Sequence, residues 1–187
     1  MKNISFALIL LSILFISSCK KEDNKNSNSS NNTTLIPGPV SDTVSSFIVY
    51  FEDTKDSITE IVSYDDPDGS GPKPANINGA ALKANRLYKL TFRIEDGTNK
   101  SNIVILNSKI KTNGKDYKLC FTNTMGLVSN PTDTDGNLPI GLNYDITTKT
   151  AGNGNLTFTI KYQRGTKNGD CTPGTVYHTC TIPLYVF

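Results

Sequence analysis

Residues 156–162, with the sequence LTFTIKY, decide the fold of this chain. Apolar and polar side chains alternate through the whole stretch: Leu156, Phe158, Ile160 and Tyr162 against Thr157, Thr159 and Lys161. In a β-strand, successive side chains point to opposite faces, so this alternation places all the apolar groups on one face. The stretch therefore predicts a half-buried strand.

The same period recurs along the chain, in residues 47–51, 58–62, 88–94, 117–122, 142–148 and 176–187. The first two of these flank a turn-like segment and predict a hairpin. Residues 102–110 (NIVILNSKI) fit either a strand or a short helix. Pro183 lacks an N–H, so we expect its part of the last strand to lie at a sheet edge.

About seven short strands separated by Gly, Pro, Asn and Asp turns predict an all-β fold, an antiparallel β-sandwich of immunoglobulin-like architecture. The chain contains no Trp, so the Cys…Trp…Cys spacing of true immunoglobulin domains is missing. "Immunoglobulin-like" therefore describes the architecture alone. We expect one such domain, spanning residues 44–187.

The N-terminus predicts a removable signal peptide, residues 1–18. A positively charged start precedes a run of thirteen residues, 4–16, of which eleven are apolar. At about 1.5 Å per residue this run is too short to cross a hydrocarbon core of roughly 30 Å. It matches the apolar core of a signal peptide instead. The alternative is an uncleaved signal anchor followed by a chance cysteine.

Residues 16–19 (ISSC) resemble the lipobox of bacterial lipoproteins. The resemblance implies cleavage before Cys19 and lipidation of that residue, with a diacylglyceryl group on its thiol and an acyl chain such as palmitate on its amine. Several acyl chains hold a protein stably at a membrane, whereas one holds it only marginally. The expected partner at this end is thus the membrane itself.

Residues 19–43 predict a flexible tether. Within them, residues 25–34 (KNSNSSNNTT) offer no apolar side chain to bury. Residues 20–23 (KKED) resemble the short charged signal that sends many Bacteroidota lipoproteins to the cell surface. The expected location is therefore the outer membrane, facing outward, with its periplasmic face as the alternative.

Three further cysteines lie in the expected domain. Cys171 and Cys180 flank a Pro-Gly turn, and Cys180 shares the apolar parity of its strand, whereas Cys120 lies on the polar side of its own. Because the compartment is oxidising, these features predict a Cys171–Cys180 disulfide with Cys120 free. The alternative, a zinc site made of Cys171, His178 and Cys180, lacks a fourth ligand.

Two loops are acidic, residues 65–71 (DDPDGSG) and 133–137 (DTDGN). Calcium takes six to eight oxygen ligands, and alternate Asp residues in a tight loop can supply several. The candidate ligands are Asp66, Asp68, Asp133 and Asp135. Neither loop completes an EF-hand pattern, and Asp-Gly and Asp-Pro are also good turn formers. No other cofactor is expected.

These loops carry a resemblance of their own. Residues 65–71, followed by residues 84–88 (ANRLY), resemble an acidic D-P-D-G-D-G loop before an "ANTTY" strand start in small uncharacterised Bacteroidota lipoproteins. Residues 133–142 match a later D-x-x-G-N-P-x-G-L loop, with Leu138 inserted. The resemblance implies a β-sandwich and a lipid anchor, and it implies no activity.

Several function classes are disfavoured. The formal net charge is +2 and the basic residues are scattered, so no nucleic-acid partner is expected. The chain has a single His and no G-x-S-x-G, H-E-x-x-H or glycine-rich phosphate loop, so we expect no enzyme. The prediction is a membrane-anchored, noncatalytic binding module for a glycan or an envelope protein. The alternative is a structural lipoprotein that docks by a sheet edge to an outer-membrane complex.

Overall fold

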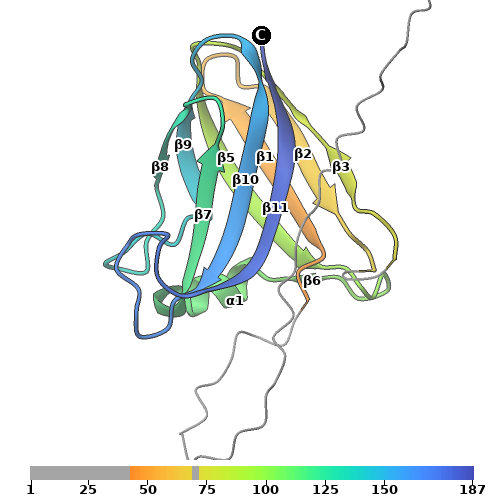
Figure 1. The fold of residues 1–187 in the computed structure, drawn as a ribbon, viewed down its shortest axis with the longest axis vertical. Helices are drawn as coiled ribbons and strands as arrows, with labels where there is room; N and C mark the ends of the chain where they lie inside the picture. The colour runs from red at the N-terminus through yellow and green to blue at the C-terminus, as the bar shows by residue number, and fades with distance from the viewer. Residues whose placement is uncertain (1–42, 69–71) are drawn as a thin grey trace, which may run out of the picture.

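The structure, a computed structural model, describes residues 43–68 and 72–187 as two β-sheets packed face to face (Figure 1). The larger sheet has seven strands in the order β3-β2-β1-β5-β9-β8, with β6 beside β5, and the smaller has four in the order β4-β11-β10-β7. The predicted all-β sandwich is confirmed, with eleven strands in the described residues where about seven were expected. The signal peptide, Cys19 and nearly all of the tether lie outside the described residues.

The strands are β1 Ser46–Asp53, β2 Thr59–Asp65, β3 Asn76–Asn78, β4 Ala80–Leu82, β5 Leu87–Asp96, β6 Val104–Ile105, β7 Tyr117–Asn123, β8 Val128–Pro131, β9 Asn143–Thr147, β10 Gly152–Tyr162 and β11 Thr175–Val186. A short helix, α1, spans Asn107–Thr112, and a 3-10 turn follows at Gly114–Asp116. None of the helices in the described part of the chain is both long and apolar enough to cross a membrane.

The long strands pair as the alternation of apolar and polar residues in the sequence predicts, whereas the short strands were not all predicted. β1 and β2 form the predicted hairpin, and residues 102–110 contain both β6 and the start of α1. One pair is parallel: β4 lies beside the end of β11, with Ala80 opposite Leu184. Before Leu184 the only ladder partner of β11 is β10, so Pro183 lies on a stretch of edge, as predicted.

The core lies between the sheets and consists of the inward half of each alternating strand. Phe92 of β5 is near its centre, with edge-to-face contacts to Phe47, Tyr144 and Phe158. Full burial of such a side chain stabilises the fold by roughly 1.5–3 kcal/mol. One end of this core is closed by Leu106, which caps the start of α1, and by Ile110 within the helix.

Because successive strands run in opposite directions, the connections between them lie at the two ends of the sandwich. The upper end in Figure 1 carries the β1–β2, β4–β5, β7–β8 and β9–β10 connections and the C-terminal residue, Phe187. The lower end carries α1 and the β2–β3, β8–β9 and β10–β11 connections. The chain also enters the domain at the lower end, where the Thr43 amide donates to Asp96 at the end of β5.

Candidate functional site

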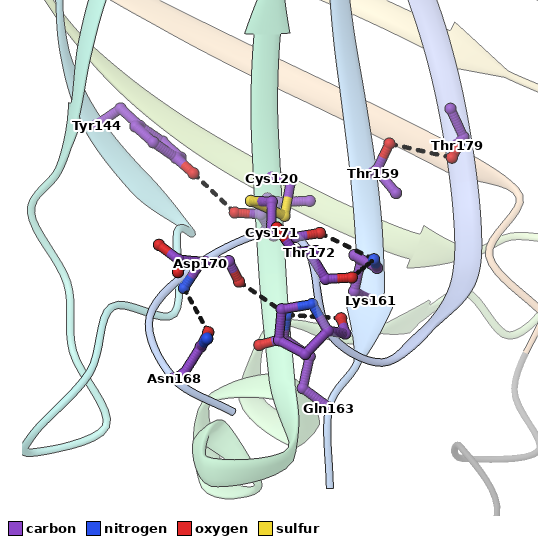
Figure 2. The surroundings of a disulfide bond; sticks show 12 residues. Cys120, Tyr144, Thr159, Lys161, Gln163, Asn168, Asp170, Cys171, Thr172 and Thr179 are labelled. Carbon is purple, nitrogen blue, oxygen red and sulfur yellow. Dashed lines mark hydrogen bonds between the residues drawn. A yellow bond between two sulfur atoms is a disulfide. The ribbon is translucent and has the colours of Figure 1, made fainter. Parts of the chain in front are cut away.

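The disulfide joins Cys120 of β7 to Cys171 of the β10–β11 loop, with a Cα–Cα distance of 5.9 Å (Figure 2). The predicted Cys171–Cys180 bond is therefore wrong. Cys180 points into the core and is fully buried, while Cys120 points outward from the four-stranded sheet. The β10–β11 loop folds back over that outer side, so it reaches only the outward cysteine. The zinc alternative fails for the same reason, because Cys171 is already bonded.

The β10–β11 loop covers the lower, outer part of β7. Gln163 Nε2 donates to the carbonyls of Asp170 and Pro173, both at 2.9 Å, which closes the loop on itself. Lys161 Nζ donates to the carbonyls of Cys171 and Thr172. Lys118 of β7 is only 3 % exposed, and this burial lowers the pKa of its ammonium group. The sequence alternation alone places Lys118 on a polar face, and the loop buries it.

Asp133, a predicted calcium ligand, instead closes the β8–β9 loop. Its carboxylate accepts backbone hydrogen bonds from Gly141, Leu142 and Asn143 at 3.0–3.1 Å. Each bond to a carboxylate contributes more than a neutral one. The side chain thus holds the loop against the start of β9, and its oxygens are engaged by the fold.

Asp135, the next predicted ligand, is also engaged. Its carboxylate accepts from the amides of Asn137 and Leu138 and from Lys167 Nζ, which lies 2.8 Å away. These donors, the Leu138 amide first and the Lys167 ammonium next, hold the pKa of Asp135 well below its usual range. Because Lys167 belongs to the β10–β11 loop, this contact fastens two loops together.

Asp66 and Asp68 lie in the β2–β3 loop, at the opposite edge of the seven-stranded sheet from the β8–β9 loop. The four predicted calcium ligands are therefore not brought together. Among residues 43–68 and 72–187, no group of three or more His, Cys, Asp or Glu side chains is placed to hold a metal. The predicted calcium role has no support from this arrangement.

A buried polar group adjoins that loop at the lower end of the core. His178 is 7 % exposed and packs against Phe47 and Tyr64, with ring centroids 5.3 Å and 5.8 Å away. Tyr64 donates to Asp66 Oδ2 at 3.1 Å. Burial raises the pKa of the Asp66 carboxyl, and Asp68 acts in the same direction. In the sequence, His178 was considered only for the alternative zinc site, so this grouping was not predicted.

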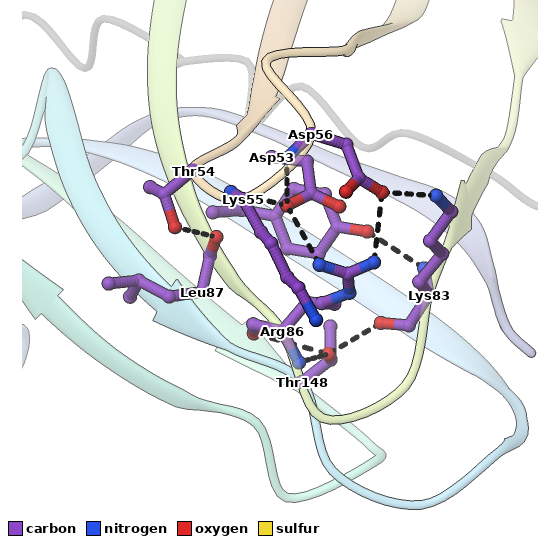
Figure 3. Close-up of polar contacts among 9 residues, drawn as sticks. Asp53, Thr54, Lys55, Asp56, Lys83, Arg86, Leu87 and Thr148 are labelled. Atoms are coloured by element: carbon purple, nitrogen blue, oxygen red, sulfur yellow. Dashed lines mark hydrogen bonds and ion pairs between the residues drawn. The ribbon is translucent and has the colours of Figure 1, made fainter.

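The upper end is tied together by an ionic cluster (Figure 3). Asp56 Oδ2 lies 2.5 Å from Lys83 Nζ and 2.8 Å from Arg86 Nη2. The hydrogen bond from Lys83 is the main cause that lowers the pKa of Asp56. Thr148 Oγ1 accepts from the Arg86 amide and donates to the Lys83 carbonyl. Three connections are thereby joined: β1–β2, β4–β5 and β9–β10.

The outer side of the four-stranded sheet, which Figure 1 shows in front, contains an uncharged region. No charged residue occurs in residues 150–160 or 179–187, which make most of β10 and the end of β11. We call the outward side chains of these two segments the neutral face. It consists of Asn153, Asn155, Thr157, Thr159, Thr179, Thr181, Pro183, Tyr185 and Phe187.

Two exposed aromatic rings stand at the upper end of the neutral face. Tyr185 and Phe187 are 52 % and 53 % exposed, and their rings are stacked with centroids 5.9 Å apart. By contrast, the outer side of the seven-stranded sheet carries charges of both signs, such as Glu52 opposite Lys89. The neutral face is therefore the candidate site. Exposed aromatic rings on an uncharged surface are typical of a surface that binds a ligand or partner.

Comparison with models of protein families, with curated proteins and with solved structures found no match for this chain.

Proposed function

We propose that this chain is a noncatalytic binding module, held at the bacterial envelope by a lipid on Cys19. It binds through the neutral face. The observation that carries the proposal is the exposed Tyr185–Phe187 pair in a surface without charge. Aromatic residues are enriched, and charged residues depleted, at the centres of interaction surfaces.

The attachment of the tether supports this assignment. The chain enters the domain at Thr43, at the lower end, whereas Tyr185 and Phe187 lie at the upper end. A module tethered in this way presents the aromatic pair at the end farther from the point of attachment. Residues 19–43, the predicted tether, connect Cys19 to this lower end.

Three charged residues at the lower end, Asp133, Asp135 and Lys167, are used by the fold, which supports a binding role over a catalytic one. The buried pair Asp135 and Lys167 joins two loops, and Asp133 is bonded to three backbone amides. Charged groups used in this way stabilise loops and are unavailable to a substrate.

Docking by a sheet edge, the second expectation, has less support. The edge strands of the seven-stranded sheet are β3, which has only three residues, and β8, which has four and ends at Pro131. Short edge strands interrupted by proline are poor templates for adding another strand. The edge at β7 is partly covered by the disulfide-bonded loop.

Site-specific photo-crosslinking in living cells tests the proposal. A photoreactive amino acid at Pro183, on the neutral face, should give adducts of lower gel mobility, and the same group at Lys89 should give none. Equal adducts at both positions, or none at Pro183, would overturn the proposed surface. Adducts confined to Asn130 of β8 would favour edge docking. In parallel, Cys19→Ala should abolish palmitate labelling and release the protein from the membrane fraction.

A further inference from the structure

We infer that the neutral face binds an uncharged polysaccharide, with Tyr185 and Phe187 stacking on the sugar rings. This inference rests on the proposed function and specifies its ligand. Three features of the described residues carry it: the chemistry of the aromatic pair, the ordered hydroxyl rows beside it, and the charge of the surface.

The aromatic pair offers a surface that fits the C–H side of a sugar ring. Tyr185 and Phe187 are two positions apart on one strand and so point to the same side of the sheet. Their ring planes differ by 20°, and about half of each side chain is open to solvent. An aromatic ring can cover an apolar patch while the Tyr hydroxyl stays hydrated.

Amide groups stand beside these rings. Asn153 of β10 is paired with Tyr185 in the ladder, and Asn155 is paired with Pro183. Directly opposed residues have Cβ atoms about 5 Å apart, so an Asn153 amide can reach a hydroxyl of a sugar stacked on Tyr185. An amide both donates and accepts, which matches the dual character of a sugar hydroxyl.

Below the rings, threonine hydroxyls form two cross-strand rows. Thr157 Oγ1 lies 3.0 Å from Thr181 Oγ1, and Thr179 Oγ1 donates to Thr159 Oγ1 at 3.1 Å. A hydroxyl has one donor and two acceptor sites, so the hydroxyls of Thr157, Thr159 and Thr179 keep capacity beyond these bonds. Because these hydroxyls are already ordered by their neighbours, binding through them requires little further loss of side-chain entropy.

Charge complementarity selects among ligand classes. Nucleic acids and anionic polysaccharides need Lys or Arg at the contact, and the neutral face has neither. Interfaces with large protein partners are enriched in aromatic, Met and Arg side chains, and the neutral face has only the Tyr–Phe pair. A surface of Thr, Asn and two rings fits an uncharged, hydroxyl-rich chain.

Affinity gel electrophoresis of the detergent-purified full chain tests the inference. The probes are dextran, mixed-linkage β-glucan and xylan as uncharged polymers, and alginate as the anionic control. We expect at least one uncharged polymer to retard the protein and alginate to leave its mobility unchanged. Tyr185→Ala should weaken the retardation about fivefold or more, because it removes half of the aromatic pair. Ile61→Ala, which alters an equally exposed apolar residue on the other sheet, should not change it.

The inference is overturned if none of the three uncharged polymers retards the protein, if only alginate does, or if Tyr185→Ala binds like the parent. Circular dichroism and the midpoint of thermal unfolding establish that each variant is folded. The crosslinking experiment separates the two proposals. Adducts from Pro183 to an envelope protein, without retardation by any polymer, would reject the glycan and keep the binding module. The absence of both would reject the binding module as well.

Discussion

Lys167 Nζ lies 2.8 Å from Asp135 Oδ2, and the two side chains are only 4 % and 6 % exposed. The contact joins the β10–β11 loop to the β8–β9 loop, and Lys167 Nζ also donates to the Gly114 carbonyl. Forming such a pair removes two charges from water, so its net contribution to stability is small. Removing one partner leaves the other buried and uncompensated.

Lys167→Met should therefore lower the free energy of unfolding by about 3 kcal/mol, measured by urea denaturation. The matched control is Arg164→Gln in the same loop. Arg164 lies 3.9 Å from Asp116 and its side chain is 43 % exposed, so solvent screens the pair and we expect a much smaller loss than for Lys167→Met. Equal losses for the two variants would contradict a special role for the buried pair.

The lowered pKa of Asp135 predicts an acid-dependent part of the stability. An unfolded Asp titrates near pH 3.9, whereas the native carboxylate keeps its charge to lower pH. The contribution is thus complete above the unfolded pKa and is lost as the pH falls below it, toward the native pKa. Urea denaturation between pH 6 and pH 3 should show a shallower decline for Asp135→Asn than for the parent. If the free energy of unfolding falls equally with pH in the two proteins, Asp135 does not contribute to the acid-dependent stability.

The disulfide predicts a definite peptide map. Digestion without reduction should yield a peptide pair bonded through Cys120 and Cys171, with Cys180 as a thiol outside any disulfide. Cys120→Ser and Cys171→Ser should each lower the free energy of unfolding by about 4 kcal/mol, from the loop-closure entropy of a loop of some fifty residues. Recovery of Cys180 in any disulfide would refute the pairing.

Gly141 should not tolerate a side chain. Its φ is +90°, and a Cβ there would collide with the Leu119 carbonyl and lie 2.7 Å from Tyr144 Oη. Tyr144 Oη donates to that same carbonyl at 2.7 Å, so none of these groups can yield freely. We expect Gly141→Ala to cost more than about 3 kcal/mol by thermal or urea unfolding.

Gly126 is the control for backbone strain alone. Its φ is +66° and a Cβ would meet nothing within 4 Å. Gly126→Ala should cost only about 1–2 kcal/mol, the usual penalty for a left-handed alanine. If both substitutions cost the same, crowding at Gly141 is not the cause.

Calcium should not stabilise the domain, since the Asp133 and Asp135 oxygens are bonded to backbone amides and Lys167. The midpoint of thermal unfolding should be the same in millimolar calcium and in EDTA. Asp133→Ala, which leaves three amides without an acceptor, should lower the free energy of unfolding by about 2–4 kcal/mol. An upward shift of the midpoint with calcium would restore the ligand hypothesis.

Much of the fold could be predicted because period two is a local property. Phe47, Val49 and Phe51 share one parity, and all three are fully buried. The three-residue β3 and β4 could not be predicted, because so few residues show no period, whereas residues 102–110, which fit a strand or a helix, contain one of each. The neutral face had a signal in the sequence, the uncharged residues 150–160 and 179–187. Its existence as one surface depends on the β10–β11 pairing.

The cysteines show where local reasoning ends. Parity placed Cys120 outward and Cys180 inward, and both placements are confirmed. The choice of partner depended on where the β10–β11 loop lies, and no local pattern encodes that. Proximity in sequence favoured Cys180, whereas contact in space favoured Cys120.

The sequence by itself determined which residues form the long strands and which of their side chains face the core, because alternation of polarity acts on each strand separately. The tertiary structure alone decided the disulfide, the burial of Lys118 and the use of Asp133 and Asp135 as loop fasteners. These depend on contacts between segments far apart in the chain. Such contacts exist only once the strands have paired in the two sheets and the loops have packed over them.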